Sequence, residues 1–143
     1  MIATISELSE LSATGLIVTT KLPTAYDVLA PDGSEVRLLA TLPRGSMAHF
    51  RLHPGQISRA IRHRTVEEIW YILQGGGEIW RSAGGQELIT ALAPGVSLTL
   101  PVGTEFQFRA SDSESIAILS ITMPPWPGAE EAEPVTGRWL STV

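Results

Sequence analysis

The 143-residue sequence contains no cysteine. This absence excludes disulfide bonds and thiolate metal ligands, and with them a small secreted fold stapled by disulfides. Positive charge is also scarce, because nine Arg and a single Lys stand against fifteen acidic residues and leave a formal net charge of -5. A general nucleic-acid surface and an anionic-membrane surface are therefore disfavoured.

Long apolar runs are missing as well. No run approaches the ~20 residues that a membrane-spanning helix needs. The first twenty residues contain neither Lys nor Arg, so the basic start of a signal peptide is absent. We therefore predict a cytoplasmic protein with no membrane partner and no nucleic-acid partner.

Helical patterning is confined to the start of the sequence. Thr4 and Glu7 have the spacing of a capping box, and the apolar residues Ile5 and Leu8 lie on one side of the helix that would follow. A short N-terminal helical segment is therefore predicted within residues 1–14.

From residue 16 onward, short runs of β-branched and aromatic residues alternate with Gly, Pro and Asp. This pattern is typical of an all-β sandwich or barrel. Turn sequences such as Pro31-Asp32-Gly33 favour antiparallel hairpins over a βαβ crossover. The predicted strands lie at residues 16–21, 35–42, 46–53, 57–63, 68–74, 77–83, 87–92, 97–100, 105–110 and 115–122.

One domain is expected over residues 1–143, with a core barrel at residues 46–123. A tail rich in Pro and Glu follows at residues 124–143. Its two Trp residues, Trp126 and Trp139, are expected to pack on the barrel or on a sister subunit. Closing the barrel mouth as a lid over a ligand is the alternative.

Glycine and polar residues have a regular spacing in the first half of the predicted barrel. Five residues separate Gly55 from Ile61, and His63 follows two positions later. Four residues then separate His63 from Glu68, and six separate Glu68 from Gly75. Gly75 opens a Gly-Gly-Gly run that suits a hairpin with close backbone approach.

A second regular spacing begins at Gly95. Five residues lead to Pro101, Gly103 follows two positions later, two more residues lead to Phe106, and three more lead to Ala110. Pro101 and Gly103 are suited to a tight turn between strands.

Together the two spacings resemble the two motifs of the cupin superfamily. The first family motif reads Gly, five residues, His-x-His, three or four residues, Glu, six residues, Gly. The second reads Gly, five residues, Pro-x-Gly, two residues, His, three residues, Asn. The resemblance implies a cupin double-stranded β-helix, or jelly-roll barrel, and it suggests a homodimer.

In the family, the two His and the Glu of the first motif and the His of the second converge on Fe, Mn, Ni, Zn or Cu. Only His63 and Glu68 carry over, because Ile61 and Phe106 have no donor atom. The resemblance therefore implies either no cofactor or a divalent metal of unknown identity, held by His63 and Glu68 together with additional ligands. The possible substitutes are His49, His53, Glu105 and Gln107.

Without a metal, the same barrel is an apolar cup for a small molecule. Strand alternation puts Arg59, Ile61 and His63 on one face, and Glu68, Trp70 and Ile72 on one face of the next strand. The predicted ligand-binding residues are Arg59, Ile61, Trp70, Phe106 and Phe108.

Three functions are open at this point. The first is an enzyme acting on a small apolar or aromatic acidic substrate, with catalytic residues His63 and Glu68. In it, His63 transfers the proton, Glu68 orients it and Arg59 holds the substrate anion. The second is a non-catalytic ligand-binding or sensing barrel, and the third is a metal-dependent dioxygenase or isomerase with a reduced ligand set.

Overall fold

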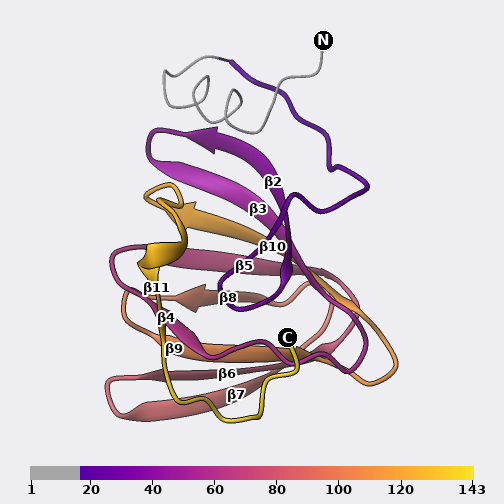
Figure 1. Cartoon of the computed structure of the whole chain (residues 1–143), viewed down its shortest axis with the longest axis vertical. Helices are drawn as coiled ribbons and strands as arrows, with labels where there is room; N and C mark the ends of the chain where they lie inside the picture. Colours follow the sequence, from indigo (N-terminus) through magenta and orange to yellow (C-terminus); the bar gives the residue numbers. More distant parts are fainter. Residues whose placement is uncertain (1–16) are drawn as a thin grey trace.

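The computed structural model describes residues 17–143, so the helical segment predicted within residues 1–14 lies outside the described residues. The described chain is nearly all β (Figure 1). Its strands are β1 (Val28–Leu29), β2 (Glu35–Leu42), β3 (Gly45–Leu52), β4 (Ile61–His63), β5 (Glu67–Gln74), β6 (Gly77–Ala83), β7 (Gln86–Leu92), β8 (Ser97–Leu100), β9 (Glu105–Ala110), β10 (Ile116–Met123) and β11 (Ala132–Pro134), with one short 3-10 turn, η1 (Ala129–Glu131), before β11.

The strands form two antiparallel sheets that lie one above the other in Figure 1. The first sheet has the order β1-β2-β3-β10-β5-β8, and the second has the order β11-β4-β9-β6-β7. Both sheets mix strands that are far apart in the sequence, such as β3 with β10 and β4 with β9. The all-β prediction is confirmed.

Strand β5 shows why the sequence folds in this way. Its residues alternate between exposed and buried, so that Glu68, Trp70 and Ile72 face the interior. Tyr71, between two of them, is 47% exposed. This period of two is the signature of a strand with one face on a core. The core joins inward residues of both sheets around Trp70, Phe106, Phe108 and Ile118.

Two glycines of the Gly75-Gly76-Gly77 run are required by close backbone approach. Gly75 has a φ of +83° and a Cβ there would collide with the carbonyl oxygen of Ser115. A Cβ at Gly77 would collide with the carbonyl oxygen of Arg109. Side chains are excluded at both positions because backbone occupies the space.

Two strand predictions are wrong in part. Residues 17–21 of the segment 16–21 form no strand, and Ile17 is fully exposed, because this segment pairs with no sheet edge. The segment predicted as a strand at 57–63 is regular only from Ile61, and before it a single bridge joins Ile57 to Arg109. The short strands β1 and β11 were not predicted.

The second half of the tail packs on the outer face of the second sheet. Gln107 on β9 accepts hydrogen bonds from the backbone N–H groups of Arg138 and Trp139, both at 2.9 Å. Its amide nitrogen donates to the carbonyl oxygens of Ser58 and Trp139, both at 2.8 Å. Arg109 also lies 4.1 Å above the Trp139 ring. Trp139 therefore packs on its own barrel, which is one of the two arrangements expected from the sequence.

Within residues 17–143, no helix has the length and apolar character needed to cross a membrane.

Candidate functional site

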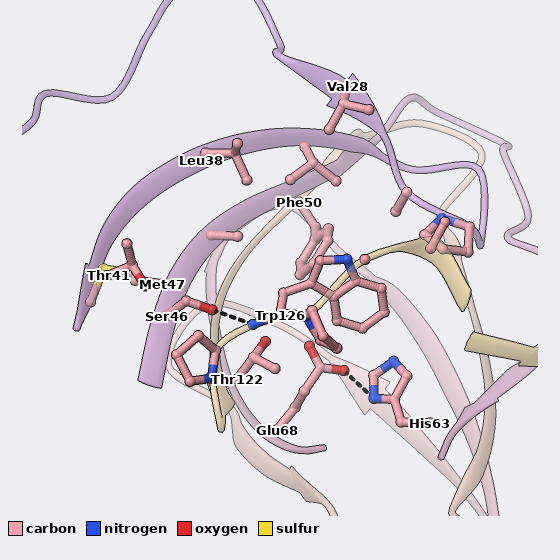
Figure 2. A pocket seen from close by; sticks show the side chains of 18 of the residues that line it. Val28, Leu38, Thr41, Ser46, Met47, Phe50, His63, Glu68, Thr122 and Trp126 are labelled. Atoms are coloured by element: carbon pink, nitrogen blue, oxygen red, sulfur yellow. Dashed lines mark hydrogen bonds and ion pairs between the residues drawn. The ribbon is translucent and has the colours of Figure 1, made fainter. Parts of the chain in front are cut away.

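A cavity of about 740 Å³ lies between the two sheets and takes side chains from both. The first sheet supplies its wide apolar wall, which includes Leu38, Met47 and Phe50 on β2 and β3 (Figure 2). The second sheet supplies Ile61, His63 and Phe106. The volume is in the range of small-molecule sites, and such sites are mainly apolar with a few placed polar groups.

His63 and Glu68 meet inside this cavity, as Figure 2 shows. The Nδ1 atom of His63 lies 3.2 Å from Oε2 of Glu68, and their side chains are only 5% and 3% exposed. His63 comes from β4 and Glu68 from β5, so the pair bridges the two sheets. The separation lets a proton pass between the two groups.

Burial inverts the ordinary acidity of the pair. It lowers the pKa of His63 to about 4, and the nearby Glu131 carboxylate opposes this only partly. Burial raises the pKa of Glu68 to about 7, although the Ser120 hydroxyl, which donates to its Oε1 at 2.7 Å, acts in the opposite direction. At neutral pH His63 is therefore uncharged, and Glu68 changes its protonation state there.

Aromatic rings enclose the pair. The Phe106 and Trp126 rings lie edge-on to the His63 ring, with centroids 5.3 Å and 5.2 Å away. Trp70 packs edge-on against Phe106 at 5.7 Å. These contacts exclude water from His63 and account for the desolvation that shifts its pKa.

The first half of the tail forms part of the cavity wall. Pro125, Trp126 and Pro127 line it, and the Trp126 backbone N–H donates to the Ser46 hydroxyl at 3.1 Å (Figure 2). Residues 125–129 line the cavity, and the later residues cover the second sheet.

Glu131 is a site-supporting residue that the sequence did not reveal. Its buried carboxylate accepts hydrogen bonds from the backbone N–H of Thr65, from the Thr65 hydroxyl at 2.8 Å and from the backbone N–H of Val66 at 2.8 Å. Burial raises the pKa of this carboxyl, but these bonds outweigh it and lower the pKa overall. Glu131 thereby fixes the connection between His63 and Glu68. The only sequence signal was an acidic run in the tail.

The donor set does not fit a firmly bound metal. Ile61 and Phe106, at the two positions without a donor, are direct partners across β4 and β9, so an apolar pair fills that part of the site. Among residues 17–143, no group of three or more His, Cys, Asp or Glu side chains is placed to hold a metal ion. His63 and Glu68 alone fall short of the usual three protein donors.

The candidate substitute ligands lie elsewhere. His49 is buried but is not part of the cavity lining, and His53 contacts Glu35 with Nε2 2.7 Å from Oε2. The Gln107 amide is hydrogen-bonded to the tail backbone, and Glu105 does not line the cavity.

Of the predicted ligand-binding residues, Ile61, Trp70 and Phe106 line the cavity, whereas Phe108 and Arg59 do not. Phe108 is fully buried beneath Trp70, with ring centroids 5.1 Å apart. Arg59 is exposed and donates from Nε to the carbonyl oxygen of Val143 at 3.0 Å. The expected alternation fails at Arg59 because β4 begins only at Ile61.

Two antiparallel sheets packed face to face define the class of β-barrel and jelly-roll proteins. The Cupin domain family matches residues 48–122, just over half of the sequence. The chain therefore belongs to the cupin family, and the predicted cupin jelly-roll fold is confirmed. No curated protein matches the chain in sequence.

Solved structures with similar folds include KdgF from a Halomonas species, with a TM-score of 0.62 and 16% identity, over 77% of this chain and 97% of that one. Oxalate decarboxylase from Bacillus subtilis gives a TM-score of 0.68 and 18% identity, over 83% of this chain and 33% of that one. The capsular polysaccharide assembling protein CapF from Staphylococcus aureus gives 0.65 and 15%, over 79% and 34%. At these identities the likeness concerns the fold.

Proposed function

We propose that the chain is a cupin-family enzyme that transfers a proton on a small, mainly apolar molecule bound in the cavity. The observation that carries the proposal is the buried Glu68 carboxyl, which has a raised pKa of about 7. Its Oε2 lies 3.2 Å from Nδ1 of the uncharged His63 imidazole. A group that titrates near the working pH is best suited to both taking and giving a proton.

The proposal exchanges the roles that the sequence favoured. Glu68 transfers the proton, and His63, with a pKa of about 4, is the neutral partner that orients the carboxyl and shares its proton. Glu68 is ionised above about pH 7 and can then remove a proton from carbon next to a carbonyl group. Isomerisation, and cyclisation or dehydration next to a carbonyl group, contain such a step, whereas decarboxylation contains its reverse, the delivery of a proton to carbon.

Exchange of carbon-bound hydrogen tests the proposal without knowledge of the natural substrate. Enolisable ketones that bind the protein are incubated in D2O, and loss of the proton next to the carbonyl is followed by NMR. We expect catalysed exchange whose rate rises with pH through a midpoint near 7. The Glu68→Gln variant should lower the rate about 100-fold or more, in line with general acid–base catalysis.

His53→Gln is the matched control, because His53 contacts Glu35 at the surface and does not line the cavity. This variant should exchange at the wild-type rate. Exchange that survives Glu68→Gln would contradict the proposal, as would a bound ketone that the wild type never exchanges.

A non-catalytic ligand-binding barrel is the second candidate, and the mainly apolar lining with two flanking aromatic rings on His63 favours it. It predicts ligand binding without exchange in the same assay. The homodimer and the cytoplasmic location stay predictions from the sequence.

A further inference from the structure

The described residues that line the cavity offer no positive charge to a ligand. None of them is Arg or Lys. His63 is the one basic group among them, and burial lowers the pKa of this imidazole to about 4, so that it is neutral at physiological pH. A carboxylate or phosphate entering the cavity would lose its hydration without gaining a cationic partner.

The neighbouring arginines are engaged outside the cavity. Arg37 donates to the carbonyl oxygens of Pro23 and Thr24 at 3.0 Å and 2.8 Å. Arg62 donates to Glu133 at 3.0 Å, and Arg59 is bonded to the carbonyl oxygen of Val143. None of the three arginines can turn inward without breaking these contacts.

A second acidic residue lines the same cavity. Asp32 is 4% exposed, and its Oδ1 accepts bonds from the Ser34 backbone N–H at 2.9 Å and from the Ser34 hydroxyl at 2.6 Å. Burial raises the pKa of Asp32, and its charge contributes to raising the pKa of Glu68. A ligand anion would therefore meet two carboxyl groups that already resist ionisation.

Two hydrogen-bond donors lie beside the polar part of the cavity. The Trp70 indole Nε1 is completely buried and makes no well-aligned hydrogen bond within residues 17–143, although Trp70 lines the cavity and its N–H interacts with the Glu68 carboxyl closely enough to lower the pKa of that group. The Glu68 carboxyl is the second donor when it is protonated. A buried donor without a partner is costly, so an oxygen acceptor on the ligand would be stabilising here.

We infer that the cavity selects an uncharged, mainly apolar molecule with a carbonyl oxygen that accepts from Trp70 and Glu68, and that it rejects anions. The inference rests on the proposed function, since it takes the cavity as the substrate site. It also replaces the acidic substrate expected from the sequence, because that expectation depended on Arg59. An organic ammonium ion would be attracted to the two acidic groups, but it offers no acceptor to the indole N–H.

Four naphthalene probes of similar shape test this ligand class. They are 2-acetylnaphthalene, 2-naphthoate, 2-naphthylmethylammonium and 2-ethylnaphthalene, and their dissociation constants are measured by ligand-observed NMR at pH 7. We expect the ketone to bind about 10-fold tighter than the hydrocarbon, which is the effect of one well-placed hydrogen bond. The carboxylate and the ammonium ion should bind more weakly than the ketone.

Variants then locate the donor. Trp70→Phe keeps an aromatic ring but removes the N–H. It should therefore weaken binding of the ketone about 10-fold and leave binding of the hydrocarbon nearly unchanged. Trp80→Phe is the matched control, because Trp80 is also buried but donates to Glu87 at 3.1 Å outside the cavity. If Trp70→Phe lowered the affinity for the ketone and for the hydrocarbon equally, the role of the indole N–H as a donor would be overturned.

The outcome is separable from that of the exchange assay. Selective ketone binding without proton exchange would reject the proposed reaction and leave the ligand class standing. Tightest binding of 2-naphthoate or of 2-naphthylmethylammonium would overturn the ligand class, and catalysed exchange on the ketone would then still support the reaction.

Discussion

The protein contains two His–Glu contacts in opposite surroundings. His53 and Glu35 lie at the surface with their closest atoms 2.7 Å apart and side chains 45% and 19% exposed. His63 and Glu68 lie 3.2 Å apart and are almost completely buried. The surface pair is the closer one, but water screens its charges and stabilises each of them separately.

The comparison shows that burial, and not contact distance, gives a His–Glu pair its chemistry. Inside the cavity the ionised forms lose their hydration, so Glu68 holds a proton up to about pH 7 while His63 releases its proton near pH 4. The buried pair therefore carries one proton on the carboxyl group and none on the imidazole over much of this interval, which is the reverse of an ordinary ion pair.

The largest effect should appear when one member of the buried pair is removed and stability is measured against pH. The raised pKa of Glu68 stabilises the fold fully below about pH 4.5, and this contribution is lost as the pH rises toward 7. The lowered pKa of His63 acts in the opposite sense, because stability is lost as the pH falls from about 6.5 to 4. The two slopes nearly cancel in the wild type.

Relative to the wild type, Glu68→Gln should therefore lose stability as the pH falls from 7 to 4.5, and His63→Gln should lose it as the pH rises from 4 to 6.5. Each change should amount to about 3 kcal/mol, since one pKa unit corresponds to about 1.4 kcal/mol. Urea unfolding across the pH series measures it. Slopes of the same sign in the two variants would contradict the inverted acidity of the pair.

A smaller effect is expected from Ser120→Ala. The Ser120 hydroxyl donates to Glu68 Oε1 at 2.7 Å and lowers the pKa of that carboxyl. Its removal should raise the Glu68 midpoint by about one unit, because hydrogen bonds to charged groups contribute about 1.5–3 kcal/mol. NMR titration of the labelled Glu68 carboxyl carbon follows the midpoint.

Ser34→Ala is the matched control, since Ser34 bonds to Asp32 instead of Glu68. An unchanged Glu68 midpoint in Ser120→Ala, or an equally large rise in Ser34→Ala, would show that the hydroxyl bond is not what tunes Glu68.

Much of the fold could be predicted because its signals are local. Gly75 and Gly77 stand where backbone approaches too closely for any side chain, and alternation along β5 assigned Glu68 and Trp70 to the interior. The same local rule failed at Arg59, because alternation holds only inside a strand and β4 begins two residues later.

The rest of the site depends on contacts that no local pattern encodes. Glu131 reaches Thr65 and Val66 from 66 and 65 positions away, and Trp126 reaches His63 from the same tail. The tail has little regular structure, so its sequence has no periodic pattern that would predict which side chains point toward the cavity. The spacing of the motif identified His63 and Glu68, but the inversion of their acidity follows from burial, to which the distant Trp126 ring contributes at His63.

The smallest effect belongs to the surface pair. A double-mutant cycle with His53→Gln and Glu35→Gln should give a coupling energy of about 0.2–1 kcal/mol, because the pair is partly exposed to water. The coupling should shrink in 1 M salt, because exposed charges are screened there over about 3 Å. Urea unfolding of the four proteins measures it. A coupling above about 2 kcal/mol that resists salt would show that the surface pair behaves like a buried one, and the contrast between the two pairs could not then be assigned to burial.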